Sequence, residues 1–208
     1  MVNTILKSLS AENFASFADR VVFTTEIDPS KKEYLENTIG IEDTRFNKVS
    51  FLYGANGSGK TFFCKILREI QRLLAFSPLT AMNNSEFLAI PQFKGLDAPV
   101  RPFAFGAEYQ ERPTVFSVDL VIEGTTYHYE FGIKGKTITS ELLTKKRRRT
   151  EKLLERTSPS FEDITLRSDL KEFESAKHRV KEEALCLPVA ALLNNQLASR
   201  IVAAIRDI

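Results

Sequence analysis

The sequence predicts an α/β protein, and three features that follow one another along the chain carry this prediction. Residues 47–53, NKVSFLY, alternate between apolar and polar side chains, which is typical of a strand. Residues 54–59 are rich in glycine, and from Lys60 the apolar side chains recur every three or four residues. We therefore expect a buried strand, a tight loop and an amphipathic helix that ends near Phe76, because Pro78 disfavours its continuation.

The rest of the chain adds further strands and helices on both sides of this unit. Short strands rich in β-branched and aromatic residues flank it, and a helical pattern closes the sequence. The proline-rich part, residues 77–105, is expected to be irregular. The expected ranges are 5–13 and 21–25 for strands, 26–46 for a polar connection with room for one helical turn, 114–144 for three alternating strands, and 169–183 and 189–205 for helices.

The glycine-rich stretch matches the spacing G-x-x-x-x-G-K-[ST], which binds a chain of phosphates. Glycines let successive backbone N–H groups point inward, and the following helix adds the positive end of its dipole. Lys60 is expected to reach the β and γ phosphates of ATP, and the Thr61 hydroxyl is expected to ligate Mg²⁺. The predicted nucleotide-binding residues in the loop are Gly54, Asn56, Gly57, Ser58, Gly59, Lys60 and Thr61.

Composition narrows the class of protein further. The 208 residues are 43% apolar and 27% charged, as in ordinary globular proteins, and the net charge is only +2. A nucleic-acid or membrane contact would therefore need a local patch. Cys64 and Cys186 form no C-x-x-C motif, and Cys64 is expected to be packed rather than reactive. With neither a secretory signal nor a membrane-length apolar stretch, we expect a cytoplasmic protein without a membrane partner.

Four motifs occur in a fixed order: NFASF at residues 13–17, GANGSGKT at 54–61, YHYEF at 127–131 and ITSELL at 138–143. Together they resemble the amino-terminal part of prokaryotic AAA-family ATPases of the ABC/SMC/RecF/OLD-like type, which often act in anti-phage defence. The resemblance implies a P-loop NTPase fold, namely an ABC/SMC-like ATPase head with an inserted antiparallel β-lobe and a helical C-terminal part. It also implies a homodimer or higher homo-oligomer in which paired heads enclose ATP and Mg²⁺, with a nuclease or toxin as effector.

The sequence departs from that family pattern in two places. In such heads an Asp–Glu pair at the end of a strand completes Mg²⁺ coordination and polarises the attacking water, and a Ser–Gly signature comes from the partner head. The nearest candidate, LVIEG around Glu123, lacks the preceding aspartate, and no signature helix is found. We therefore expect this chain to bind nucleotide weakly at best and not to hydrolyse it. It resembles a truncated head whose last helix, residues 189–205, has an uncovered apolar face.

Four other features have two readings each. By its rough position Gln92 is a candidate contact to Mg²⁺ and water, and the alternative is an ordinary loop glutamine. Residues 14–17 either approach the base or ribose or simply pack. The basic run KKRRR, residues 145–149, could contact DNA, RNA or an acidic partner, or form a solvated face. His128 and His178 lack metal-ligand spacing and are expected to be structural or exposed.

These features lead to one preferred reading and two alternatives. Residues 1–103 are expected to form the first part of the ATPase head, residues 104–160 the β-lobe and residues 161–208 a helical segment. The preferred function is ATP binding within a defence ATPase that senses infection and controls an effector. The alternatives are a DNA repair or recombination head of the RecF or SMC kind, and a scaffold that binds nucleotide without hydrolysing it. A small-molecule kinase fits the expected β-lobe less well.

Overall fold

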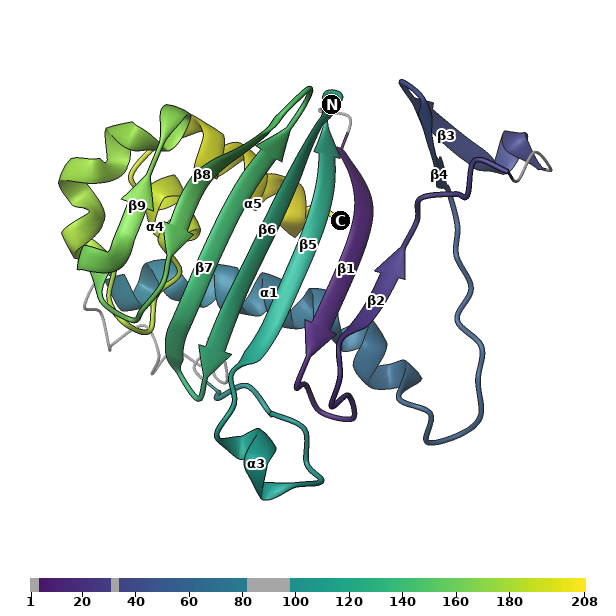
Figure 1. Ribbon diagram of the computed structural model, residues 1–208, viewed down its shortest axis with the longest axis horizontal. Helices are drawn as coiled ribbons and strands as arrows, with labels where there is room; N and C mark the ends of the chain where they lie inside the picture. The colour runs from purple at the N-terminus through teal and green to yellow at the C-terminus, as the bar shows by residue number, and fades with distance from the viewer. Residues whose placement is uncertain (1–3, 31–33, 82–97) are drawn as a thin grey trace.

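A seven-stranded antiparallel sheet dominates the computed structural model, which describes residues 4–30, 34–81 and 98–208 (Figure 1). Its strand order is β2-β1-β5-β6-β7-β8-β9, so the N-terminal strands join the later ones through the pairing of β1 with β5. This pairing unites strands from residues 1–103 with strands from residues 104–160 in one sheet. The strands are β1 (Thr4–Glu12), β2 (Val21–Thr24), β5 (Thr114–Ile122), β6 (Thr125–Lys134), β7 (Thr137–Lys146), β8 (Thr150–Arg156) and β9 (Ile164–Leu166).

Helices cover one face of this sheet, and α1 crosses behind the strands in Figure 1. The chain packs α4 and α5 against each other and against α1, and α5 also reaches β5. The helical elements are α1 (Lys60–Ala81), α3 (Ala107–Gln110), α4 (Cys186–Leu192) and α5 (Gln196–Arg206), with 3₁₀ segments η1 (Leu35–Asn37), η3 (Phe161–Asp163) and η4 (Ser168–Arg179).

The core lies between the sheet and the helices because alternate strand residues point to the same face. In β5 the side chains of Phe116, Val118 and Leu120 are at most 1% exposed and face the helices. Ile66 and Ile70 of α1 meet them from the other side and are fully buried. The alternation predicted for residues 114–144 is therefore confirmed, and its cause is a one-sided core.

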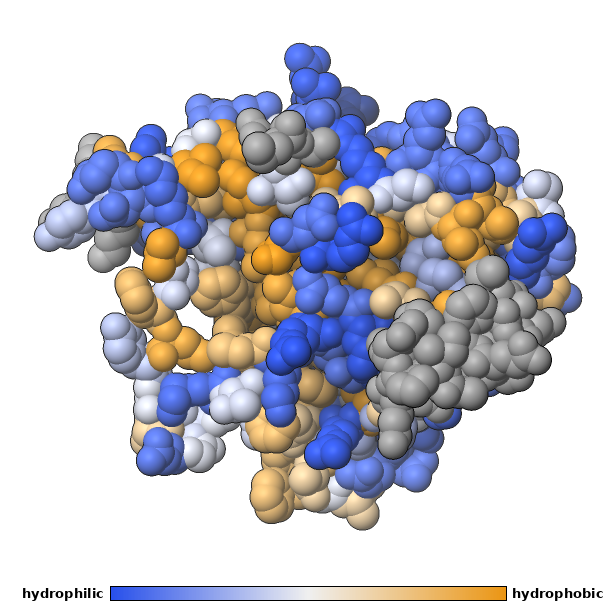
Figure 2. Space-filling view, turned by 180° about the vertical axis from the view of Figure 1, so that it is seen from behind, coloured by the Kyte–Doolittle hydropathy of each residue, from blue (hydrophilic) through white to orange (hydrophobic). Residues whose placement is uncertain are grey.

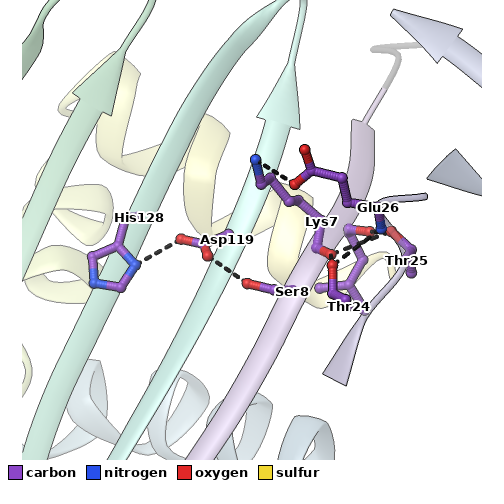
Figure 3. Close-up of polar contacts among 8 residues, drawn as sticks. Lys7, Ser8, Thr24, Thr25, Glu26, Asp119 and His128 are labelled. Atoms are coloured by element: carbon purple, nitrogen blue, oxygen red, sulfur yellow. Dashed lines mark hydrogen bonds and ion pairs between the residues drawn. The ribbon is translucent and has the colours of Figure 1, made fainter. Parts of the chain in front are cut away.

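No described helix covers the opposite face of the sheet in Figure 1, and polar side chains lie on it. Cross-strand pairing places Ser8, Asp119 and His128 side by side on this face (Figure 3). The Asp119 carboxylate accepts hydrogen bonds from Ser8 Oγ and bonds His128 Nδ1 at 2.6 Å. Asp119 lies between the serine and the histidine, so the histidine cannot activate the serine as a base. His128 is thus structural, as expected.

A buried polar network explains two of the sequence motifs. Glu141, in the motif ITSELL, is 1% exposed and accepts hydrogen bonds from Tyr129 Oη at 2.8 Å and from the amides of Cys186 at 2.7 Å and Leu187 at 2.9 Å. Burial raises the pKa of the Glu141 carboxyl. The motif residues of β6 and β7 therefore hold the start of α4 against the sheet, and nearby Arg156 is equally buried, donating to backbone carbonyls.

Three helix predictions are wrong, and the first concerns the end of α1. α1 continues to Ala81, with Pro78 inside it. Ser77, buried at the same place, donates from Oγ to Leu73 O at 2.8 Å and accepts from the amide of Leu185 at 3.0 Å. This contact ties the end of α1 to the segment before α4, so tertiary packing offsets the helix-breaking tendency of the proline.

The predicted helix at 189–205 is two helices. Asn194 adopts φ 66°, which breaks the α-helical path, and Asn195 caps α5 by accepting a hydrogen bond from the amide of Ala198 at 3.0 Å. The apolar face of α5 is covered by the chain itself, because Ile201 and Ile205 are fully buried in the core. The expectation of an uncovered apolar face on this helix was therefore wrong.

The predicted charged helix at 169–183 is also different in the structure, where the shorter 3₁₀ segment η4 takes its place.

The polar connection 26–46 contains an unexpected hairpin. β3 (Thr38–Ile41) pairs with β4 (Thr44–Asn47), after the expected helical turn η1. Figure 1 shows this hairpin beside the large sheet, beyond its β2 edge. Each strand has only four residues, which is too short for a clear alternating pattern in the sequence.

Candidate functional site

The predicted phosphate loop joins β4 to α1 by way of a connecting limb (residues 48–59) that runs outside the sheet (Figure 1). Within the loop the amide of Ser58 donates to Ala55 O at 3.3 Å. Gly57 and Gly59 adopt φ values of 82° and 89°, which side chains other than glycine rarely adopt. The backbone path of the loop therefore requires glycine at positions 57 and 59.

The three loop glycines differ in what surrounds them. A Cβ atom at Gly54 would lie 2.9 Å from Ser58 Oγ, so this position cannot accept a side chain without movement. A Cβ atom at Gly59 would lie 2.9 Å from Ser16 Oγ and 3.1 Å from the Phe17 ring. At Gly57 a Cβ atom would meet nothing within 4 Å, so the middle of the loop faces open space.

Lys60 supplies the positive charge of the loop. Its Nζ donates to the carbonyl oxygens of Gly54 at 2.7 Å and Ala55 at 2.6 Å, which brings the ammonium group into the curve of the backbone. Thr61 follows in the first turn of the 22-residue helix α1, where unpaired N–H groups and the helix dipole favour an anion. The structure therefore brings the predicted residues of 54–61 together at one helix N-terminus.

The motif NFASF forms a tight turn against this loop. Phe14 and Phe17 exchange backbone hydrogen bonds of 2.9 and 2.8 Å, which places Ser16 beside Gly59. Asn13, at φ 51°, holds the turn because its amide nitrogen donates to Tyr109 O at 2.8 Å and its Oδ1 accepts from the amide of Phe103 at 3.0 Å. The role of Asn13 was not predicted, although its place at the head of the motif was the available signal.

The two phenylalanines of this turn have different surroundings. Phe14 is 5% exposed and packs against Phe116 at a ring-centroid distance of 5.1 Å, so the packing interpretation is confirmed for this residue. Phe17 is partly buried and meets Phe63 of α1 edge-on at 6.4 Å. Phe17 therefore joins the first turn of α1 to the turn that borders Gly59.

The segment before the loop is not the buried strand that the sequence predicted. Val49, Phe51 and Tyr53 are 66%, 76% and 84% exposed, and residues 48–53 pair with no described strand. Seen from behind, apolar groups of the connecting limb stand clear of the body of the molecule (Figure 2). Alternation in a sequence indicates a pleated strand only when a neighbouring strand supplies the ladder hydrogen bonds, and the described residues supply none here.

Two other sequence predictions had different outcomes. Cys64 is exposed on α1, so the expectation that it is packed was wrong; the apolar face of the helix turns away from it. Gln92, the candidate contact to Mg²⁺ and water, lies outside the described residues. The described histidines, cysteines and carboxylates contain no group of three or more that could hold a metal ion.

A basic pocket of about 530 Å³ runs along α1 beside the NFASF turn. Its lining includes Phe14, Lys65, Arg68 and Arg101. The amide of Ala15 donates to Arg101 O at 3.0 Å, which fixes the backbone of the pocket rim against the turn. Sequence reasoning missed Arg101, because only the folded chain brings it next to α1.

The chemistry of the loop fits nucleotide phosphates. Positive φ at Gly57 and Gly59 forms a cradle whose centre has room, and Lys60 brings a cation to it. The hydroxyl of Ser16, beside Gly59, is buried without a described hydrogen-bond partner, so a polar group is available at the edge of the loop. Thr61 is the chain's own candidate ligand for Mg²⁺. These features define a P-loop nucleotide-binding domain.

A comparison with protein families identifies the class more closely. The family model described as "AAA domain, putative AbiEii toxin, Type IV TA system" matches residues 49–184, and the chain belongs to this family of AAA-type P-loop ATPase domains. No curated protein and no solved structure matches the chain. The match begins inside the connecting limb, so the limb and the phosphate loop are part of the family domain together with β5–β9.

None of the described helices combines the length and the apolar character that a membrane span requires.

Proposed function

We propose that the chain is the ATP-binding part of a defence or toxin–antitoxin ATPase whose nucleotide state controls an effector nuclease or toxin. The observation that carries the proposal is the phosphate loop, with Lys60 in the curve of the backbone and Gly57 and Gly59 at positive φ. The family description, which names a toxin of a type IV system, supports the biological setting. A cytoplasmic location is part of the same proposal.

In this proposal each residue of the loop has a separate task. The backbone amides of residues 55–59 donate to phosphate oxygens, except that of Ser58, which already donates to Ala55 O. Lys60 exchanges its carbonyl partners in the loop for the β and γ phosphates, which accept a stronger charge-assisted hydrogen bond. Thr61 orients Mg²⁺, which when bound neutralises charge that develops on the phosphates.

The finer part of the proposal is an ABC/SMC-like head that works as a homodimer or higher homo-oligomer. Such heads take their catalytic carboxylates from an Asp–Glu pair at the end of a strand, and the sequence contains no such pair. In this proposal the carboxylates that hydrolysis needs therefore come from elsewhere. The exposed apolar side chains of the connecting limb are the surface that such an assembly would cover.

Two alternative functions can be distinguished from the proposed one by experiment. A DNA repair or recombination head of the RecF or SMC kind would share the phosphate loop but would connect to a long coiled coil. A scaffold would bind nucleotide as a structural ligand, and its assembly would survive the loss of Lys60. Retained oligomerisation after Lys60→Ala would favour the scaffold over the ATP-driven head.

The test is the affinity for ATP with Mg²⁺, measured by titration calorimetry on the wild type, Lys60→Ala and the matched variant Lys65→Ala. Lys65 lies on the same helix but lines the basic pocket. Its replacement therefore removes the same charge from α1 and leaves the phosphate loop unchanged. A charge-assisted hydrogen bond contributes about 1.5–3 kcal/mol, so Lys60→Ala should weaken binding by about 10- to 100-fold. Lys65→Ala should change the affinity less than about threefold.

Phosphate release is followed in the same samples. Binding that depends on Lys60, without release, is the expected result. Equal affinities for the wild type and Lys60→Ala would overturn the assignment of the loop, and turnover by the chain alone would show that its catalytic carboxylates had been missed.

A further inference from the structure

The basic run of the sequence forms the tip of a rigid hairpin, which we call the basic hairpin (residues 145–150). β7 ends at Lys146 and β8 begins at Thr150, and these two residues face each other across the ladder. β7 is also paired with β6 along its length, so the base of the hairpin is fixed on both sides. Residues 146–149 are all exposed.

The nearby acidic groups are already occupied by a different lysine. Lys145 forms ion pairs with Glu151 at 3.3 Å and with Asp169 at 3.2 Å, and Ser168 Oγ also donates to Glu151. By contrast, residues 146–149 form no ion pair with any residue in the described part of the chain. The tip therefore keeps four uncompensated positive charges, although the whole chain has a net charge of only +2.

The spacing and chemistry of these charges select the kind of partner. Because Lys146 and Thr150 pair with each other, the chain reverses between them and the four charges are concentrated in one tight turn. Duplex DNA carries one charge about every 1.7 Å of its axis, so it offers several phosphates to such a cluster. Three of the four side chains are arginines, whose planar guanidinium groups bind phosphate through two parallel hydrogen bonds.

The tip carries no apolar side chain, since its sequence is Lys-Lys-Arg-Arg-Arg-Thr. Protein interfaces are anchored by buried aromatic or aliphatic groups, and membrane-surface helices insert apolar residues. The basic hairpin offers neither kind of anchor. We propose that the basic hairpin binds the phosphate backbone of duplex DNA without reading its sequence.

This surface is separate from the phosphate loop. In Figure 1 the β7–β8 tip lies at the top of the sheet, whereas the N-terminal end of α1 lies at the lower right. A DNA contact at the tip does not compete with a nucleotide at Lys60. The proposal stands apart from the proposed ATPase function, and DNA binding measured without nucleotide tests it alone.

The experiment compares two double variants that remove the same charge. Arg147→Gln with Arg148→Gln changes the tip, and Lys171→Gln with Arg179→Gln changes two exposed residues of η4. Binding of a short, fluorescently labelled random-sequence DNA duplex is followed by anisotropy over a series of salt concentrations. Circular dichroism melts of all three proteins check that they are equally folded.

The wild type should bind the duplex, with an affinity that falls steeply with salt. The tip variant should bind about tenfold more weakly at low salt, and the slope of log K against log salt should fall by about 2, or about 1 for each lost phosphate contact. The η4 variant should keep the wild-type slope. The proposal is overturned if the wild type does not bind the duplex, if both variants lose affinity equally, or if the tip binds anionic phosphatidylglycerol vesicles but not the duplex.

Discussion

The sheet with its helices and the connecting limb are built from similar residues but have opposite surroundings. Phe116 in β5 is fully buried, whereas Phe51 in the limb is 76% exposed. Both belong to alternating apolar stretches, and both fall between turn signals. The difference is that β5 has a hydrogen-bonded strand on each side and helices over one face, whereas the limb has none of these among the described residues.

This contrast separates the part of the molecule that stabilises it from the part that carries the candidate site. The sheet satisfies its own backbone hydrogen bonds and buries its apolar face, which are the two requirements of an independently stable unit. The phosphate loop takes its geometry from three local sources: its glycines, the start of α1 and the NFASF turn. Substitutions in the core should therefore lower stability most, whereas substitutions in the loop should act mainly on nucleotide binding and cost less stability.

The largest expected effect on stability compares one phenylalanine of the core with one of the connecting limb. Phe116→Ala should lower the free energy of unfolding by about 3–5 kcal/mol, because it leaves a cavity in the core. Phe51→Ala should change it by less than about 0.5 kcal/mol, because the side chain is largely in water already. Urea unfolding of both variants measures the two values. A loss at Phe51 as large as at Phe116 would mean that the limb is packed in solution.

A slightly smaller loss is expected from the buried network beneath α4. Glu141→Ala removes the acceptor of three hydrogen bonds, leaving two amides and the Tyr129 hydroxyl buried without partners. We expect a loss of about 3 kcal/mol in the free energy of unfolding. Ser140→Ala, the exposed neighbour, serves as the control and should cost less than about 0.5 kcal/mol. Similar stabilities for both variants would contradict a role of Glu141 in holding α4.

The loop glycines allow a finer test of where the limb meets the body. Gly59→Ala places a methyl group against Ser16 and Phe17 and also requires a positive φ, so it should cost about 2 kcal/mol. Gly57→Ala meets open space and should cost about 1 kcal/mol, from its backbone conformation alone. Unfolding curves measured in parallel decide the order, and a greater loss at Gly57 would place the tight contact elsewhere.

The smallest effect is a pH dependence on the polar face of the sheet (Figure 3). The hydrogen bond with Asp119 raises the pKa of His128 above its ordinary value of 6.5, against the opposing effect of burial. Burial tends to raise the pKa of Asp119, but the hydrogen bonds from His128 and Ser8 lower it below 3.8 overall. The pair therefore stabilises the fold most between pH 3.8 and pH 6.5, the ordinary pKa values of the two groups. Its contribution is lost as the pH rises through the raised pKa of the histidine.

We expect the free energy of unfolding to fall by about 0.5–1 kcal/mol between about pH 6 and pH 8, with solvent screening included. His128→Gln should remove this fall while Ser8→Ala should keep most of it. Denaturant unfolding at several pH values measures the slope, and an unchanged slope in His128→Gln would assign it to another group.

Features that depend on nearby residues could be predicted from the sequence, whereas features that depend on distant segments could not. The residues of 54–61 were identified because the motif is local: glycine conformations, a lysine and a helix start depend on neighbours within a few positions. The strands of residues 114–144 were predicted for the same reason. The role of Asn13, the end of α1 beyond Pro78 and the surroundings of residues 49–53 could not be predicted, since each depends on segments distant in sequence.

The sequence by itself therefore determined the phosphate loop, the amphipathic helix behind it, the alternating strands and the basic run. Tertiary structure alone decided that β1 pairs with β5, that Glu141 receives the amides of α4, and that the basic run becomes the tip of a hairpin. Local geometry follows from residue types and their spacing. Burial and charge compensation follow from what lies opposite each residue, and only the folded chain brings those groups together.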